Sequence, residues 1–586
     1  MLSVFKRFSR RDIAVVLASL AFTVAQTWLD LKLPDYMEEI TRLLQTAGGE
    51  LGDIWAVGAK MLACALASAA TAVAVGFMGA RLAASFAQRL RADMFARVEE
   101  FTMEELGGFS TASLITRTTN DVTQVQMIIA MGLQVAIKAP IMAVWALAKI
   151  SARSWEWLAL TGGAVVSLVI LIACVMTYAL PRFRRVQTLT DNLTRVTREN
   201  LSGMRVVRAY NAEEYQEAKF EDANRELTDN TLSVHRAMAV FNPGMRLVMS
   251  GLTLGIYWIG AFLIESAPVA DKLAVFSNMI VFSTYATQVL MSFMMLTMIF
   301  MMSPRVAVSI RRIHEVLSTE PKLRDGGVTQ SPPELRGVVE FENVSFKYPG
   351  AEDYVLRDVS FTARRGETVA FIGSTGSGKS TLINLVPRFY DVTDGRVLVD
   401  GVDVRDYTQE ALRKKIGYVP QRAVLFTGDV TGNVAFGDSA GGAADADGVA
   451  RAVRIAQADD FVSGMEGGYS AAISQGGANI SGGQKQRLSI ARAIYRDPEI
   501  LVFDDSFSAL DYSTDRELRA ALKRETRGVT SLIVAQRIGT IRDADRIIVL
   551  DEGVLVGSGT HDELMRDCEV YREIAFSQLS REELGV

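Results

Sequence analysis

The segment from Gly373 to Ser380 has the residue types and the spacing of a phosphate-binding loop. Its sequence, GSTGSGKS, fits the pattern G-x-x-x-x-G-K-[ST]. The glycines let the backbone turn tightly and direct several N–H groups at phosphate oxygens. Lys379 would bring a positive charge to the outer phosphates of a nucleotide, and Ser380 a hydroxyl to a bound Mg²⁺. The predicted phosphate site comprises Gly373, Ser374, Thr375, Gly376, Ser377, Gly378, Lys379, Ser380 and Thr381.

The residues on each side of this loop predict the elements that would position it. Thr368–Ile372 is a short apolar run typical of a buried strand, and Ser380–Leu385 begins a helical pattern. The N-terminus of that helix would add its dipole and its unpaired N–H groups to the phosphate site. A chance glycine-rich turn would not be expected to have both flanking elements. We therefore expect a strand–loop–helix unit.

Two further segments could take part in the same chemistry. Ile500–Asp504 is a hydrophobic strand that ends in a carboxylate suited to a metal ion, and Asp505 follows it. Upstream lie Ser481, Gly482, Gly483 and Gln484, just before a predicted helix over Leu488–Tyr495. A serine and two glycines at a helix start can form a second anion site, although a plain helix cap has the same composition.

The order of these segments resembles the ATP-binding cassette (ABC) family over the C-terminal third or more of the chain. The resemblance implies that ATP and Mg²⁺ bind, and that Ser481 to Gln484 form a signature that closes over ATP held by a second cassette. It also implies roles for residues that match the family's motifs. These are Tyr348 for stacking on adenine, Ser380, Gln421 and Asp504 for the metal, and Asp511 for linking the two composite sites.

Two positions depart from the family's pattern, and both concern hydrolysis. Asp505 stands where the family favours glutamate as the base that activates water, and Gln536 stands where it has a histidine at the terminal phosphate. The shorter Asp505 side chain would place its carboxylate roughly 1 Å further from that water, which can cost about a hundredfold in rate. Glutamine can donate a hydrogen bond to phosphate but cannot become a cation. We expect binding of ATP with impaired hydrolysis, unless Asp505 works as a base in a tighter site.

An intact signature beside a weakened catalytic site is similar to one half of a heterodimeric, multidrug-type ABC exporter. In such an exporter the signature of this chain would complete a competent site whose glutamate and histidine come from a second half-transporter subunit. The chain would then be an ATPase and translocase only as a dimer. Two other functions remain open: a homodimeric exporter with slow turnover, and an ATP-gated channel or regulatory membrane subunit.

The first three hundred residues have the composition of a membrane domain. The chain has 586 residues, of which 49% are hydrophobic. A helix needs about 20 apolar residues to cross a bilayer, and six stretches approach that length. They are Ile13–Leu31, Trp55–Met78, Met127–Ala148, Trp157–Leu180, Val240–Ile264 and Leu273–Met302. This composition excludes a purely soluble cassette ATPase.

The placement of Lys and Arg predicts how the spans are oriented. Arginine-rich segments at Arg81–Arg117 and Arg182–Arg246 indicate the cytoplasmic side, which also receives the N-terminus and the cassette. The midpoints of these segments, Thr111–Val122 and Ser202–Glu213, match the family's coupling helices, although solvated helical hairpins would have the same composition. We expect a multi-pass protein of the cell (plasma) membrane.

The sequence thus predicts a six-span α-helical ABC exporter transmembrane domain fused to an α/β P-loop nucleotide-binding domain. Residues 1–320 form the transmembrane domain with two long cytoplasmic extensions, residues 321–337 a proline- and glycine-rich linker, and residues 338–586 the cassette. A net charge of −5 gives no indication of nucleic-acid binding. The partners expected are a lipid bilayer, a second subunit and a small amphipathic or apolar substrate.

Overall fold

The chain divides into two compact units. The computed structural model describes residues 8–45, 51–151, 155–269, 271–437 and 444–579. Unit 1 contains residues 1–99 and 111–319, and unit 2 contains residues 100–110 and 320–586. The short segment 100–110 therefore belongs with the C-terminal unit, although the sequence places it between two predicted spans.

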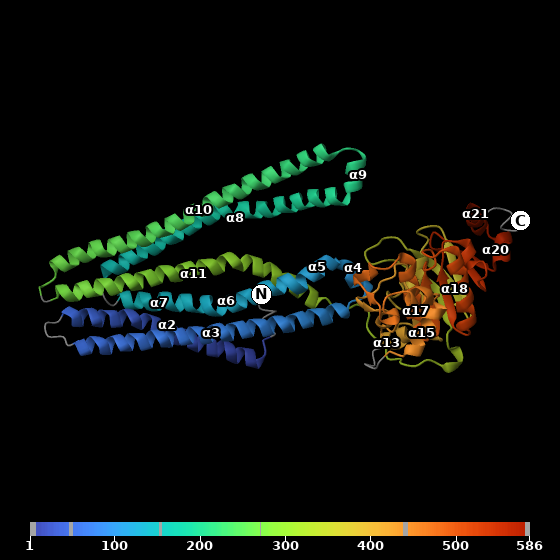
Figure 1. Ribbon diagram of the computed structural model, residues 1–586, viewed down its shortest axis with the longest axis horizontal. Helices are drawn as coiled ribbons and strands as arrows, with labels where there is room; N and C mark the ends of the chain where they lie inside the picture. The colour runs from blue at the N-terminus through green and yellow to red at the C-terminus, as the bar shows by residue number, and fades with distance from the viewer. Residues whose placement is uncertain (1–7, 46–50, 152–154, 270, 438–443, 580–586) are drawn as a thin grey trace. The chain divides into compact units, whose positions relative to one another are not determined.

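Unit 1 is built from long helices (Figure 1). Six of the described helical runs are long and apolar enough to cross a membrane, which confirms the predicted six-span domain. The helices continue well beyond the apolar stretches, so that several have 36 to 54 residues. Their bounds are α2 Arg10–Gln45, α3 Leu51–Glu99, α5 Thr111–Thr116, η1 Arg117–Asp121, α6 Val122–Met131, η2 Gly132–Ala136, α7 Ile137–Ser151, α8 Trp155–Ser202, α9 Met204–Ala209, α10 Glu213–Ser266 and α11 Lys272–Ser318.

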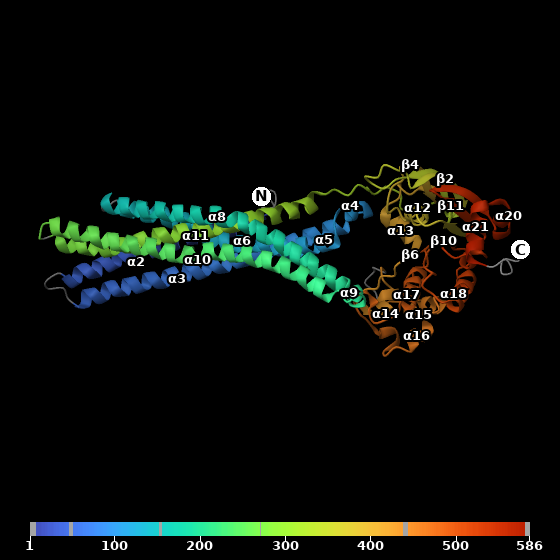
Figure 2. The same cartoon turned by 90° about the horizontal axis from the view of Figure 1, so that it is seen from above.

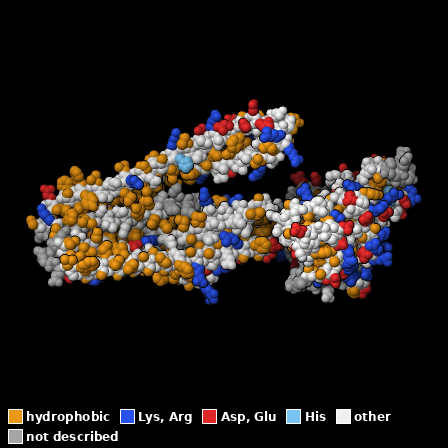
Figure 3. Space-filling view, viewed as in Figure 1, with side chains coloured by type: hydrophobic (Ala, Val, Ile, Leu, Met, Phe, Trp, Pro, Cys, Tyr) orange, Lys and Arg blue, Asp and Glu red, His pale blue; other side chains and the backbone are white. Residues whose placement is uncertain are grey.

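The helices of unit 1 pack in two groups. Helices α2, α3, α7 and α11 lie side by side, whereas α8 and α10 pack along one another and are joined at one end by α9 (Figures 1 and 2). Figure 3 shows hydrophobic side chains covering the half of these helices opposite α9, while Lys, Arg, Asp and Glu gather toward α9. This distribution is the one that a bilayer around the apolar half would favour.

Charged side chains connect α2 to α7 within the apolar part of unit 1. Asp30 of α2 lies 2.8 Å from Lys138 of α7 and accepts a hydrogen bond from Ser68 of α3. Lys138 lies near the middle of its predicted apolar stretch, between the π-helical turn η2 and Pro140. Proline has no N–H for the helical ladder, which gives a physical reason for the irregular turn before it. Charges at this depth are costly unless they are paired.

A second ion pair lies further along the same helices. Asp35 of α2 is 2.7 Å from Lys149 and accepts a hydrogen bond of 2.5 Å from the hydroxyl of Tyr285 in α11. Tyr285 is fully buried and also donates to the carbonyl oxygen of Leu31. The two pairs therefore hold α2, α7 and α11 together in this unit.

Unit 2 is an α/β domain with a mainly parallel sheet, which confirms the predicted fold class. A six-stranded sheet has the order β12-β11-β3-β10-β9-β6, and a four-stranded antiparallel sheet has the order β2-β1-β4-β5. The strands are β1 Val339–Phe346, β2 Leu356–Ala363, β3 Thr368–Gly373, β4 Asp394–Val399, β5 Val402–Asp403, β6 Ile416–Val419, β7 Gly428–Asp429, β8 Ala472–Ile473, β9 Ile500–Asp504, β10 Thr530–Val534, β11 Arg546–Asp551 and β12 Val554–Gly559.

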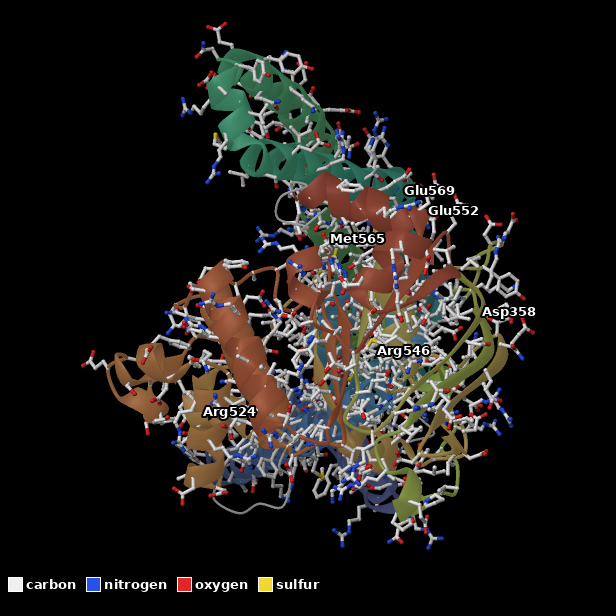
Figure 4. All side chains as sticks on the ribbon, turned by 90° about the vertical axis from the view of Figure 1, so that its right-hand side faces the viewer. Asp358, Arg524, Arg546, Glu552, Met565 and Glu569 are labelled. Carbon is white, nitrogen blue, oxygen red and sulfur yellow. The ribbon has the colours of Figure 1, made fainter. Side chains whose placement is uncertain are left out.

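Helices cover the sheets of unit 2 and close two hydrophobic cores, one on each side of the parallel sheet. Arg546 of β11, labelled in Figure 4, forms an ion pair with Glu367 just before β3. The helices are α4 Met103–Gly108, η3 Pro333–Leu335, α12 Lys379–Leu385, α13 Gln409–Lys414, α14 Val430–Val434, α15 Ala446–Ile455, α16 Asp459–Ser463, η4 Gly468–Ser470, η5 Gln475–Gly477, α17 Gly482–Tyr495, α18 Tyr512–Glu525, α19 Ile538–Ile541, α20 His561–Asp567 and α21 Glu569–Gln578.

The two segments expected to contain coupling helices differ in the structure. A separate short helix, α9, lies within Ser202–Glu213. In contrast, Thr111–Val122 belongs to the continuous helical run of α5, η1 and α6, and the separate short helix of that region is α4. Thr102 caps α4 through a capping box with Glu105, which fixes where this helix begins.

We expect the Asp30–Lys138 pair to stabilise unit 1 only as a pair. Replacing Lys138 with methionine leaves the Asp30 carboxylate without its cation. Because both side chains are partly exposed, the loss should be smaller than the roughly 3–5 kcal/mol that breaking a fully buried pair costs. The Lys138→Met protein should therefore melt at a lower temperature in detergent, and adding Asp30→Asn should recover most of the loss. Lys60→Met, at an exposed lysine of α3, is the control. Equal melting temperatures for the single and double variants would contradict this account.

Candidate functional site

Three parallel strands of unit 2 end at the same edge of the sheet and bring the predicted site together. Strand β10 lies between β3 and β9 and is parallel to both. The carboxyl ends of these strands are Gly373, Asp504 and Val534. Such an edge is where ligands bind in open α/β sheets. The phosphate-binding loop, the Asp504–Asp505 pair and Gln536 therefore become neighbours, although 31 residues separate Asp505 from Gln536.

The phosphate-binding loop has the geometry that its glycines predict. Gly378 has a φ of 91° and precedes α12, while a Cβ on Gly373 would lie 1.9 Å from a backbone oxygen of β11. The amine of Lys379 donates hydrogen bonds to the carbonyl oxygens of Gly373 at 2.9 Å and Ser374 at 2.7 Å, and to the hydroxyl of Ser377 at 3.2 Å. Phosphate oxygens could take the place of these acceptors without moving the helix.

Ser380 and Asp504 are in direct contact. The hydroxyl of Ser380 donates a hydrogen bond of 2.6 Å to the carboxylate of Asp504 at the end of β9. Burial raises the pKa of Asp504, and this hydrogen bond opposes the shift. Burial likewise lowers the pKa of Lys379, against the nearby carboxylates Asp505 and Asp504. A cation or a phosphate bound here would change the electrostatic environment that sets the pKa of Asp504 and the pKa of Lys379.

The donor set fits Mg²⁺ shared with phosphates better than a metal held by protein alone. A serine hydroxyl and one carboxylate are oxygen ligands of the kind that Mg²⁺ takes when substrate phosphates supply the others. Among the described residues no group of three or more His, Cys, Asp or Glu side chains could hold a metal ion. Ser380 and Asp504 could therefore hold Mg²⁺ together with a nucleotide, where the ion would neutralise phosphate charge.

One oxygen of Asp505 receives two side-chain amides. The amide nitrogen of Gln536 lies 2.7 Å from Oδ2, and the amide nitrogen of Gln421 lies 3.3 Å from the same atom. We call Asp505, Gln421 and Gln536 the carboxylate–amide triad. Burial raises the pKa of Asp505, while the hydrogen bond from Gln421 lowers it. Both residues that depart from the family's pattern are therefore engaged with each other.

Asp505 is also held by its backbone. Its φ of 45° lies in the left-handed region, which non-glycine residues rarely adopt outside of turns. Its N–H donates to the carbonyl oxygen of Val534, so that it continues the parallel ladder beyond β9. The direction of the Asp505 carboxylate is therefore fixed by the main chain as well as by its partners.

Gln578 is a residue of this site that the sequence did not indicate. Its side-chain amide nitrogen donates to the carbonyl oxygen of Gln536 at 2.7 Å, and its amide oxygen accepts from the N–H of Ile538 at 2.9 Å. With Ile574 and Ser577 of α21, it lines a cavity of about 480 Å³ that also contains the phosphate-binding loop and the triad. Gln578 belongs to no motif and lies 42 residues from Gln536, so spacing offered no signal.

Tyr348 is held next to the phosphate-binding loop. Its hydroxyl lies 2.9 Å from that of Thr381 in α12. Its ring makes edge contacts with Phe346 and Tyr390, with centroids 5.0 and 5.4 Å apart. These contacts fix the direction of the ring, and a planar base could stack on a ring held in this way.

The predicted signature lies at the start of α17. Ser481 is the N-cap, and it forms a capping box with Gln484, whose side-chain oxygen accepts from the Ser481 N–H at 2.8 Å. The helix was expected to begin at Leu488, but this capping box makes it begin at Gly482. Among the described residues, none of the four signature residues lines the cavity of the phosphate-binding loop. The structure therefore does not bring the signature into this chain's own phosphate site.

Two more contacts concern residues near the motifs. Asp511 caps α18 and accepts hydrogen bonds from Ser513 and Thr514, which lower the pKa of Asp511. Gln486 of α17 is buried and donates to the carbonyl oxygen of Pro420, the residue before Gln421. This last contact connects the signature helix to the triad, and a glutamine in a helix gave no sign of it in the sequence.

Comparisons with known proteins agree with this geometry. Residues 16–293 match the ABC transporter transmembrane region, and residues 356–508 match the ABC transporter family. An uncharacterized ABC transporter ATP-binding protein of Mycobacterium tuberculosis is 40% identical over 99% of this chain and 98% of its own length. An ATP-dependent lipid A-core flippase of Pseudomonas aeruginosa is 33% identical over 83% of this chain and 79% of its own length.

A solved structure has the same fold. It is a bacterial Atm1-family ABC exporter with ATP bound, with a TM-score of 0.79, 24% identity, and coverage of 97% of this chain and 98% of its own. Three findings agree: unit 1 has multiple apolar spans, unit 2 has a phosphate-binding loop at the edge of a parallel sheet, and the relatives are matched over most of their length. The chain belongs to the ABC transporter family.

Proposed function

We propose that this chain is one subunit of an ATP-driven membrane exporter and that it binds ATP at its own site without hydrolysing it efficiently. The observation that carries the proposal is the carboxylate–amide triad, in which Asp505 faces two amides beside an otherwise complete phosphate-binding loop.

The residues of several motifs support the proposed binding of ATP. Backbone N–H groups of residues 373–381 and the Lys379 amine would hold the phosphates, and the ring of Tyr348 would stack on adenine. Ser380, Gln421 and Asp504 would hold Mg²⁺. None of these groups is altered by the changes at the hydrolytic positions, so we expect Mg·ATP to bind.

ATP hydrolysis at this site should be slow for a chemical reason. A general base must lie within hydrogen-bond reach of the water it activates. The short Asp505 side chain instead accepts from Gln536 and Gln421, and burial raises its pKa. Gln536 cannot supply the positive charge that a histidine could. The two changes act on one chemical step, so their effects should not simply add.

The signature supports an asymmetric dimer as the working form. Ser481, Gly482, Gly483 and Gln484 are intact and lie away from the phosphate cavity of this chain. We propose that they complete a hydrolytic site on a second, different subunit, and that Asp511 connects the two sites. ATP binding would then close the two cassettes and turn the spans outward, and hydrolysis at the partner's site would reset them.

The membrane part of the proposal concerns location and substrate. The Lys and Arg pattern supports a cell (plasma) membrane protein with the N-terminus and cassette in the cytoplasm, with residues 321–337 as the linker. A relative named as a flippase of lipid A-core supports an amphipathic or apolar substrate.

Transport by an exporter requires ATP hydrolysis. Substrate uptake into inverted vesicles therefore distinguishes an exporter from an ATP-gated channel or regulatory subunit.

Hydrolysis by the assembled dimer should depend on the partner's base and not on Asp505. We expect low ATPase activity from this chain alone and higher activity with its partner. Replacing the partner's catalytic glutamate by glutamine should abolish turnover, since general bases contribute about 10²- to 10⁴-fold. Asp505→Asn should change turnover less than about twofold, because the Asp505 carboxylate is not used as a base. Vigorous activity of the chain alone would contradict the asymmetric dimer and support a homodimer.

Introducing the family's glutamate in place of Asp505 and its histidine in place of Gln536 should give this chain a hydrolytic site. We expect Asp505→Glu together with Gln536→His to raise ATPase activity of the purified chain at least about tenfold, since the signature is intact and a misplaced base costs about a hundredfold. Adding Lys379→Met should remove the gained activity by weakening phosphate binding. An inactive double variant that still binds ATP would show that the two positions do not limit hydrolysis.

A further inference from the structure

We propose that Gln578 in the C-terminal helix is a positioning residue that sets the preference of this site for ATP over ADP. It goes beyond the proposed function, on which it rests in requiring that nucleotide binds at the phosphate-binding loop and that Gln536 reaches its terminal phosphate. Gln578 contacts the backbone of the segment 536–538 and acts through the Gln536 side chain.

The two hydrogen bonds of Gln578 fix both ends of one side-chain amide. Its nitrogen donates to the carbonyl oxygen of Gln536, and its oxygen accepts from the N–H of Ile538. Because donor and acceptor are both used, the amide has one orientation that satisfies the segment. The backbone of residues 536–538 is thereby tied to α21, while the Gln536 side chain is held separately by its hydrogen bond to Asp505.

Helix α21, which carries Gln578, is packed into a hydrophobic core. Tyr571 and Ala575 are fully buried in the same hydrophobic core as Ile538. The hydroxyl of Tyr571 also lies 2.7 Å from Nδ1 of His561, the first residue of α20. Figure 4 labels Met565 in α20 and Glu569 at the start of α21, which mark this pair of helices. Gln578 therefore connects a packed element to a loop at the nucleotide cavity.

Only the binding of the terminal phosphate should depend on Gln578. The Gln536 amide donates to Asp505 in this structure, and in the proposed ATP-bound form it would donate to an oxygen of the terminal phosphate. With its backbone held, only side-chain torsions need to change. ADP has no terminal phosphate, so its binding through the phosphate-binding loop should not depend on how Gln536 is held. Loss of Gln578 should therefore weaken binding of a triphosphate selectively.

The experiment measures the affinities of the full-length chain in detergent or nanodiscs for AMP-PNP and for ADP. We expect Gln578→Ala to raise the Kd for AMP-PNP about three- to tenfold, the range for one or two lost hydrogen bonds, and to leave the Kd for ADP unchanged. Glu573→Ala, an exposed residue of α21, is the matched control.

A double-mutant cycle tests whether Gln578 acts through Gln536. In a Gln536→Ala background, Gln578→Ala should cause no further change in the Kd for AMP-PNP. An equal loss of AMP-PNP and ADP affinity, or a full Gln578→Ala effect in that background, would overturn the proposal and assign Gln578 a structural role. Both results are independent of hydrolysis rate, so the asymmetric dimer can fail while this inference stands.

Discussion

The proposed function depends on the direction of one carboxylate, that of Asp505. The backbone of Asp505 is fixed by a left-handed conformation and by a hydrogen bond to Val534. Its side chain is fixed by amides from Gln421 and Gln536, which reach the same oxygen. Under the proposed function, a carboxylate occupied in this way would be a poor base, while the phosphate-binding loop beside it would still hold a nucleotide. In that account, ATP binding and ATP hydrolysis are separated between neighbouring groups.

The rest of unit 2 makes this separation possible. The parallel strands β3, β9 and β10 place the loop, Asp505 and Gln536 at one edge of the sheet. Helix α21 then holds the Gln536 segment from outside the motifs through Gln578. The signature lies at the start of α17, outside that cavity, and in the proposed dimer it would complete the site of a second cassette. In unit 1, paired charges such as Asp30 with Lys138 hold together the helices that would carry the transport step.

Local patterns predicted the fold and the motif positions well, because each depends on short-range chemistry. The strand at Ile500–Asp504 has the predicted bounds, and the six apolar helical runs are present. Contacts between distant residues were not predictable in the same way. No spacing rule joins Gln578 to Gln536, and the helix at Leu488–Tyr495 begins six residues earlier because Ser481 caps it. The separate short helix α4 was likewise not predicted, although Thr102 and Glu105 have the spacing of a capping box.

The most direct test of the central claim is a single-turnover measurement on the assembled dimer with ATP trapped in both sites. If the Asp505 site holds ATP without splitting it, about half of the trapped nucleotide should become ADP, and the ATP that remains should be at the site of this chain, as site-specific photolabelling would show. Conversion of ATP to ADP at equal rates in both sites would contradict the account, because Asp505 would then act as a working base.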